Sequence, residues 1–133
     1  MSLIELMTVM VIVAILGAIA IPSYRAYVVR ANRSDAKTSL MFLSGALERC
    51  YTRYNSYAYN ADAALGCTVA FPQTSDNGYY SITAPTRTAT TFMLTATPQG
   101  AQATDTACGN LSLDNVNSRY KTGTKALSEC WGK

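Results

Sequence analysis

The sequence predicts an α+β fold in which one long amino-terminal helix, half of it protruding and hydrophobic, packs on an antiparallel sheet of three or four strands. A run of nineteen uncharged residues from Leu6 to Tyr24 indicates the first half of the helix. Apolar residues then recur at helical spacing as far as Tyr54, which indicates the second half. After residue 79, short segments rich in β-branched and aromatic residues indicate the strands.

The length of the chain limits the number of domains. With 133 residues, the protein is long enough for one domain with its own core and too short for two of ordinary size. We expect a hydrophobic helical segment over residues 1–24 and one globular head over residues 25–133. The head should contain an amphipathic helix over 25–54, a connecting loop over 55–78, and a sheet with a disulfide-bounded carboxy-terminal region over 79–133.

The uncharged run is long enough to cross a membrane. Nineteen residues extend about 29 Å as a helix, which is close to the thickness of the hydrocarbon core of a bilayer. The run lacks the basic start of a signal peptide and continues into a further helical pattern, so we expect it to be retained. Because Pro22 lacks an N–H donor and clashes with a preceding carbonyl, we expect a kink or loosening between Gly17 and Pro22.

The second half of the helix has one apolar face. From Tyr24 to about Tyr54 the chain has no proline, and its only glycine is Gly45. Apolar residues follow one another in steps of three and four, which is the period of a helix with one buried side. They are Ala36, Leu40, Leu43, Leu47, Cys50 and Tyr54. The complete helix would be roughly 75 Å long.

The region after residue 55 is predicted to be a loop followed by strands. Gly66, Pro72 and the turn-forming cluster 75–78 mark the loop. We expect Pro85 and Thr86 to form the first turn between strands and residues 98–106 to form the second connection. The strand candidates are Tyr79 to Ala84, Thr90 to Thr97 and Asn110 to Asn115, with Arg119 to Lys121 as a short edge strand.

Composition argues against an enzyme, a cofactor and a bound metal. The chain has no histidine, no phosphate-binding glycine loop and no HExxH motif. The net charge is +3, and Glu5 is the only charged residue among the first 24. The rest of the chain therefore carries +4, which is mildly basic and far from a dedicated nucleic-acid-binding domain.

Four cysteines indicate disulfides. None of them belongs to a C-x-x-C pair, which disfavours a structural zinc site in a chain without histidine. An even number of cysteines beside a membrane or export segment indicates oxidation outside the cytoplasm. Cys50, Cys67, Cys108 and Cys130 can pair in three ways.

The opening MSLIELMTVMVIVAILGAIAIPSY closely resembles the amino-terminal segment of type IV pilins and their pseudopilin relatives. The resemblance runs from Ser2 to about Tyr27. Its most telling residues are Leu3, Ile4, Glu5, Leu6, Pro22, Ser23 and Tyr24. Beyond this block the resemblance is architectural, carried by the helix, the strands and the cysteines.

The resemblance implies processing of the amino terminus. In that family a prepilin peptidase removes a short leader after a glycine, and the new terminus, usually an N-methylated phenylalanine, becomes residue one. Met1 takes this place here, either as a mature terminus that departs from phenylalanine or as the residue that a start codon encodes in a chain lacking the leader. Under the first interpretation, which we prefer, Glu5 falls at the family's glutamate position.

The resemblance also favours one pairing of the cysteines. The family commonly pins its carboxy-terminal region with a disulfide, and two of the possible bonds close short local loops. We therefore expect Cys50 to bond Cys67, and Cys108 to bond Cys130, within a pilin fold.

A pilin acts by polymerising, so the resemblance implies a structural subunit of a type IV pilus. We expect the chain to lie in the bacterial inner membrane and then, with the pilus assembly machinery, to enter a helical homopolymer on the cell surface. The filament would serve adhesion, twitching motility or DNA uptake. In its core, Glu5 of one subunit would neutralise the terminal amine of Met1 in a neighbour, because a buried carboxylate needs a partner.

Three alternatives remain. A minor pilin could act as a DNA receptor in natural transformation, using the basic and aromatic residues of the carboxy-terminal loop to hold phosphates and stack a base; a solvated basic loop is the simpler interpretation. These residues are Arg119, Tyr120, Lys121 and Lys125.

A type II secretion pseudopilin is less favoured, since the major pseudopilins tend to have a calcium loop where this chain has cysteine pairs. A membrane-anchored binding domain that never polymerises would leave Glu5 without a role.

Overall fold

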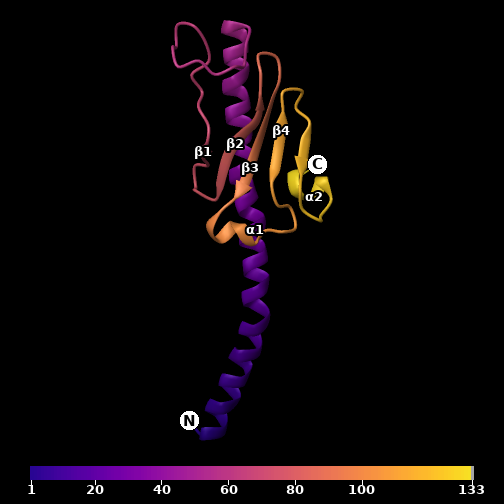
Figure 1. Cartoon of the computed structure of the whole chain (residues 1–133). Helices are drawn as coiled ribbons and strands as arrows, with labels where there is room; N and C mark the ends of the chain where they lie inside the picture. Colours follow the sequence, from indigo (N-terminus) through magenta and orange to yellow (C-terminus); the bar gives the residue numbers. More distant parts are fainter. Residues whose placement is uncertain (133) are drawn as a thin grey trace. The chain divides into compact units, whose positions relative to one another are not determined.

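The computed structural model describes residues 1–132 (Figure 1). The chain separates into two compact units, Met1–Ala31 and Asn32–Lys133, which we describe one at a time. The elements are the helix α1 (Leu3–Tyr54), the strands β1 (Gln73–Thr74), β2 (Tyr80–Arg87) and β3 (Phe92–Pro98), the 3₁₀ helix η1 (Gly100–Thr104), the strands β4 (Leu111–Asp114) and β5 (Arg119–Lys121), and the helix α2 (Leu127–Trp131).

The helix α1 begins with a reciprocal cap and continues through Pro22. The backbone N–H of Ser2 donates to Glu5 Oε2 at 2.6 Å, and the N–H of Glu5 donates to Ser2 Oγ at 3.4 Å. This capping box satisfies two of the free donors at the start of the helix. Pro22 lies inside the helix and does not end it. The kink expected between Gly17 and Pro22 stays a prediction.

The first unit presents a large apolar surface. Its large hydrophobic side chains from Leu3 to Ile21 are each more than half exposed in the isolated chain. By length and composition, α1 is able to cross a membrane. Exposed apolar surface of this extent marks a site that lipid or other protein chains cover.

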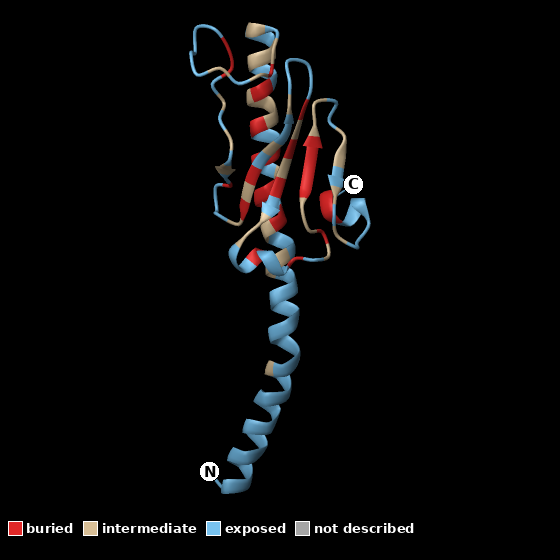
Figure 2. Ribbon diagram, viewed as in Figure 1, coloured by how far each residue is buried: buried red, intermediate tan, exposed pale blue. Residues whose placement is uncertain are grey.

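The second unit contains the sheet and the core. The five strands pair antiparallel in the order β1-β2-β3-β4-β5, so each strand lies beside the next one in the sequence. One face of the sheet packs against the second half of α1, where buried residues are concentrated (Figure 2). Burying each large aliphatic side chain contributes about 1.5–3 kcal/mol. The core residues include Ala36, Leu40, Leu43 and Leu47 of α1 with Tyr80, Ile82, Phe92, Leu94, Leu111 and Leu113 of the sheet.

The predicted α+β architecture is confirmed, with one strand more than expected and one turn misplaced. The two-residue strand β1 was not predicted. Pro85 and Thr86 lie inside β2, where the register shifts between Thr83 and Thr86, and the predicted turn there is wrong. β1 pairs only with Ser81 and Ile82 of β2, so the edge of β2 beyond Ile82 is uncovered. The missing N–H of Pro85 therefore removes no hydrogen bond to β1. The connection to β3 instead lies at Thr88–Thr91.

Two disulfides fix the loops of the second unit, in the pairing that the sequence favoured. Cys50 near the end of α1 bonds Cys67 in the connecting loop, with a Cα–Cα distance of 5.2 Å. Cys108, before β4, bonds Cys130 in α2, with a Cα–Cα distance of 5.6 Å. Each bond closes a loop of the size for which chain-entropy arguments give about 3 kcal/mol of stabilisation.

Candidate functional site

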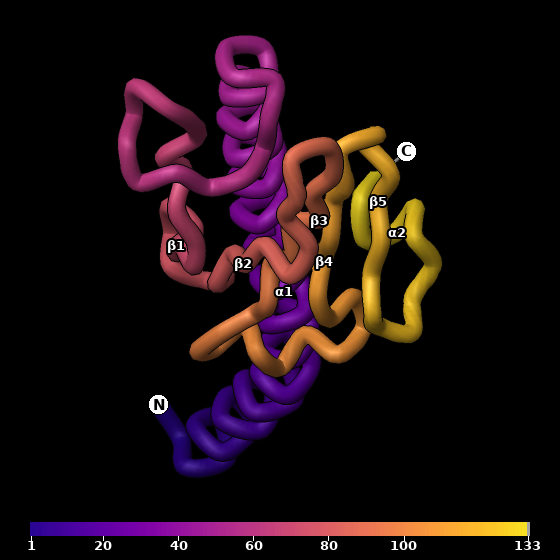
Figure 3. The backbone as a smooth tube through the Cα atoms, turned by 45° about the horizontal axis from the view of Figure 1, so that its top comes forward, coloured from indigo at the N-terminus to yellow at the C-terminus, as the bar shows by residue number. Residues whose placement is uncertain are grey.

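The basic residues predicted to contact DNA lie at one edge of the sheet. The segment between Cys108 and Cys130 holds β4, β5 and α2, and Figure 3 shows β5 at the edge opposite β1. Arg119, Tyr120 and Lys121 are consecutive in β5, so their side chains point alternately to opposite faces. The structure therefore places Arg119 and Lys121 on one face of the sheet and Tyr120 on the other.

Arg119 is anchored against α2. Its cross-strand partner is Leu113, so it points toward the same side of the sheet as the core. The guanidinium carbon lies 5.4 Å from the ring centroid of Trp131, within the range of a cation–π contact. The Trp131 side chain is buried, and its Nε1 donates to the Tyr120 carbonyl at 3.0 Å. Arg119 is thus a positioned, partly buried cation.

The two lysines are bound locally at the surface. Lys121 Nζ donates to the Gly123 carbonyl at 2.7 Å. Lys125 Nζ lies 3.3 Å from Glu129 Oε1, and both side chains of this pair are about half exposed. Two interactions lower the pKa of Glu129: the hydrogen bond from the backbone N–H of Ala126 has the larger effect, and the hydrogen bond from Lys125 has the smaller. An exposed pair of this kind contributes little stability, so a phosphate group can compete with Glu129 for the ammonium group of Lys125.

The Tyr120 ring lies beside a carboxylate rather than between two basic side chains. Its hydroxyl donates to Asp114 Oδ2 at 3.0 Å on the outer face of the sheet. Its cross-strand partner there is Ser112, which shares a 2.9 Å hydrogen bond with Thr95. The arrangement that the sequence indicated, an aromatic ring flanked by cations, is therefore not formed within β5.

The charge of this region is small. The segment from Cys108 to Cys130 holds three basic residues and two acidic ones, a net charge of +1. Arg119, Lys121 and Lys125 supply the positive charge, and Asp114 and Glu129 supply the negative charge. A duplex bound here would meet a few cations and not a continuous basic surface.

A second group of basic and aromatic residues lies where α1 ends. Arg49 and Arg53, four residues apart on the helix, are both exposed. The Arg53 guanidinium lies 5.2 Å from the ring centroid of Tyr54, and Arg87 of β2 lies 5.6 Å from that of Tyr59. This cluster was not predicted, although the i, i+4 spacing of the two helical arginines, followed by a tyrosine-rich stretch, is a local signal for it.

Part of the tyrosine-rich stretch packs into the core of the second unit. The rings of Tyr51 and Tyr57 are stacked with centroids 4.7 Å apart, and Tyr57 meets Phe92 edge-on at 4.8 Å. Burial and a hydrogen bond to Glu48 raise the pKa of Tyr57 to about 12. Tyr57 therefore stays neutral in the core, whereas Tyr59 remains exposed.

The predicted assembly residues lie at the open end of the first unit. Met1 and Glu5 are both exposed, and the carboxylate of Glu5 accepts the N–H of Ser2. Within one chain, Glu5 therefore caps its own helix. The predicted pair joins this carboxylate to the amine of Met1 in a second copy, and it stays a prediction.

Comparison with known proteins identifies the family. Residues 22–112, about two thirds of the chain, match the model of the family described as "Type IV minor pilin ComP, DNA uptake sequence receptor". The fimbrial protein EcpC of Eikenella corrodens is 41% identical over 69 residues, which are 51% of this chain and 45% of that protein. The match thus spans less than half the length of this relative.

One solved structure has the same fold, and a second is similar in sequence. The non-core minor pilin PilV of Neisseria meningitidis superposes with a TM-score of 0.56 at 18% identity, over 75% of this chain and 92% of PilV. A type IV pilin from Shewanella oneidensis is 34% identical, with a TM-score of 0.47, over 68% of this chain and 89% of that one. The chain is a structural, non-enzymatic protein of the type IV pilin class and belongs to the family of the minor pilin ComP.

Proposed function

We propose that this protein is a minor pilin that enters a type IV pilus and binds DNA there during natural transformation. The observation that carries the proposal is the family match over residues 22–112, which extends far beyond the amino-terminal segment shared by pilins of every role. The receptor role, an alternative from sequence alone, now has more support than the role of an abundant structural subunit.

The charges of the second unit support weak, salt-dependent contact with DNA phosphates. Arg119, Lys121 and Lys125 present three cations at one edge of the sheet, and Arg49 and Arg53 add two exposed cations at the end of α1. Each phosphate that a lysine or arginine neutralises releases counterions, so affinity falls as salt rises. With so few cations, we expect modest affinity and a shallow salt dependence.

The amino-terminal segment supports assembly into a filament. Residues 1–24 would lie in the inner membrane until the prepilin peptidase and the assembly machinery deliver the subunit to the pilus. In the filament, the exposed apolar side chains of several copies would cover one another. The pair of Glu5 with the amine of Met1 in a neighbour would then set the register of stacking, since a misplaced subunit leaves two charges bare.

The test is DNA binding by the full chain in detergent micelles, measured with a duplex oligonucleotide over a range of salt. Replacing Lys121→Ala with Lys125→Ala should weaken binding and reduce the slope of log affinity against log salt by about 2. Single replacements, Lys125→Ala against Lys37→Ala, compare equal losses of charge inside and outside the segment from Cys108 to Cys130. Unchanged affinity of the double variant would exclude this segment as the duplex site.

A second candidate is a major subunit of the pilus. The relative in Eikenella corrodens, whose name describes a fimbrial protein, favours it. The abundance of the chain in purified filaments separates the two candidates, because a minor pilin is sparse in the fibre and a major pilin constitutes most of it.

A further inference from the structure

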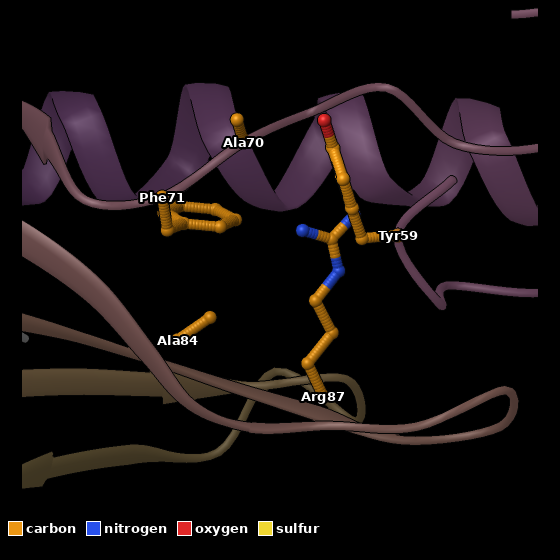
Figure 4. A pocket seen from close by; sticks show the side chains of 5 residues that line it. All are labelled: Tyr59, Ala70, Phe71, Ala84 and Arg87. Carbon is orange, nitrogen blue, oxygen red and sulfur yellow. The ribbon is translucent and has the colours of Figure 1, made fainter. Parts of the chain in front are cut away.

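A cavity of about 350 Å³ opens between the connecting loop and the uncovered edge of β2. Its walls are Tyr59, Ala70, Phe71, Ala84 and Arg87. Figure 4 shows the ring of Phe71 and the methyl group of Ala84 on one side and the guanidinium group of Arg87 on the other, with Tyr59 beyond it. Among residues 1–132, no carboxylate lines the cavity and Arg87 is the charged lining residue, so the charge of the cavity is positive.

Arg87 is held in place from three directions. Its Nε donates to the Tyr57 carbonyl at 2.8 Å, Nη1 donates to the Val69 carbonyl, and Nη2 lies 3.4 Å from Cys67 Sγ. A guanidinium group has five N–H donors. Two of them thus have no partner among residues 1–132. The cation is fixed in orientation and still able to bind an anion.

Aromatic rings lie beside this cation. The guanidinium carbon is 5.6 Å from the ring centroid of Tyr59 and 5.5 Å from that of Phe71. Tyr59 is 55% exposed, so much of its ring is open to a ligand. The neighbouring Tyr57, by contrast, is buried in the core.

The loop that carries these rings is fixed before any ligand arrives. The disulfide from Cys50 to Cys67 ties it to α1. The N–H of Asn60 donates to the Cys67 carbonyl at 2.8 Å, and the N–H of Tyr57 donates to the Ala89 carbonyl at 3.0 Å. A site that is already ordered loses little conformational entropy on binding.

These features select a ligand with a planar ring and a negative charge. A simple inorganic anion would leave the aromatic surface unused, and a neutral aromatic compound would leave the two free N–H groups of Arg87 unpaired. A nucleotide has both parts, because every base offers a face for stacking and every phosphate accepts from arginine. The volume lies at the lower end of the range for small-molecule sites, which suits one nucleotide.

We propose that this cavity binds one unstacked nucleotide, with its base against Phe71 and Tyr59 and its phosphate on the free N–H groups of Arg87. The source is either a free nucleotide or a nucleotide within single-stranded DNA. The inference that the ligand is a nucleotide depends on the cavity alone. The inference that the nucleotide belongs to single-stranded DNA rests on the proposed function. Duplex DNA, whose bases are stacked, fills the cavity only where its ends fray.

The experiment uses the full chain in detergent micelles and four probes. They are adenosine monophosphate, a short single strand carrying one 2-aminopurine, the same strand with an abasic site at that position, and a blunt duplex. We expect the 2-aminopurine emission to fall on binding and the abasic strand to bind more weakly. Phe71→Leu should reduce affinity for the single strand about tenfold and leave duplex binding unchanged.

Two further variants keep the test decisive. Tyr59→Leu replaces an exposed ring, so it carries the test if Phe71→Leu disturbs the fold. Phe42→Leu removes another exposed aromatic ring, on α1 and away from the cavity, and should change nothing. If neither Phe71→Leu nor Tyr59→Leu weakens binding, or if the abasic strand binds as well as the intact one, the proposal is wrong.

The probes also separate this proposal from the proposed function. Binding of the mononucleotide as tightly as the strand identifies a free nucleotide as the source, and binding of the strand alone identifies DNA. If duplex affinity is unchanged in the Lys121 and Lys125 variants while Phe71→Leu still reduces the fall in 2-aminopurine emission, the proposed duplex site is wrong and the nucleotide pocket is supported. Duplex binding that depends on the lysines, with unresponsive 2-aminopurine, rejects the pocket alone.

Discussion

Arg33 and Asp105 form a buried bidentate ion pair between α1 and the segment that follows η1. Arg33 Nε lies 2.7 Å from Asp105 Oδ2, and Nη2 lies 2.8 Å from Oδ1. The side chains are 8% and 1% exposed. The N–H of Cys108 also donates to Asp105 Oδ1 at 3.2 Å. One carboxylate thus joins the helix to the start of the disulfide-bounded region.

This pair makes stability depend on acid. Burial alone would raise the pKa of Asp105, but the hydrogen bonds from Arg33 and the N–H of Cys108 outweigh it, and the net effect lowers the pKa. A carboxylate with a lowered folded-state pKa stabilises the fold above its unfolded pKa and loses that contribution as the pH falls. We expect the free energy of unfolding, measured by chemical denaturation, to decline below about pH 4.

The acid dependence should be smaller in a matched variant. Asp105→Asn removes the titrating group, so its denaturation midpoint should change less between neutral pH and about pH 3 than that of the native chain. Asp76→Asn alters an exposed carboxylate and should leave the acid dependence as it is. An equal decline in the native chain and in Asp105→Asn would assign the acid sensitivity to other groups.

Removing both partners of the pair should cost less than removing one. Asp105→Leu alone leaves the Arg33 guanidinium buried without a counter-charge, which costs on the order of 3 kcal/mol of unfolding free energy. Combining it with Arg33→Met fills the same space with apolar groups and should restore much of that loss. A double-mutant cycle measures the coupling. A double variant no more stable than Asp105→Leu would contradict this prediction.

The sequence predicted the helix and the main strands because both depend on local periodicity. The core positions Leu40, Leu43 and Leu47 follow from steps of three and four, and they are buried as expected. Arg33 and Asp35 are exceptions on that helix, because a charge predicts an exposed position and both side chains are buried. The burial of Arg33 depends on Asp105, which is 72 residues away along the chain, and no local pattern shows such a partner.

The candidate site was predictable in its location and not in its geometry. Basic residues within one disulfide loop gave the region, but the alternation of side chains along β5 separates Tyr120 from Arg119 and Lys121. The cavity at Arg87 was missed because its walls come from the connecting loop and from β2. Pro85 was the misleading signal there, since a proline at an uncovered strand edge and a proline in a turn look alike in sequence.

Truncating a core residue of α1 tests the packing of helix on sheet. Leu40 is fully buried and Met41 beside it is 47% exposed. Leu40→Ala should lower the free energy of unfolding by about 2–5 kcal/mol, because the deleted methyl groups leave a cavity. Met41→Ala should change it by less than about 0.5 kcal/mol. Thermal melts of the two variants make the comparison, and similar losses would show that α1 packs differently.

Replacing Glu5 separates folding from assembly. Glu5→Gln keeps the size of the side chain and can still accept from the Ser2 N–H, so the helix cap should survive with a few tenths of a kcal/mol lost. It removes the charge that would meet the terminal amine of a neighbouring copy. We expect the variant to fold normally and to yield few or no sheared surface filaments by electron microscopy in a host that supplies the assembly machinery. Ser2→Ala is the control, because it weakens the cap and keeps the carboxylate, so its filaments should persist. Filaments from Glu5→Gln in native amount would show that the carboxylate acts only as a cap, and the register of stacking would then have to come from the apolar side chains alone.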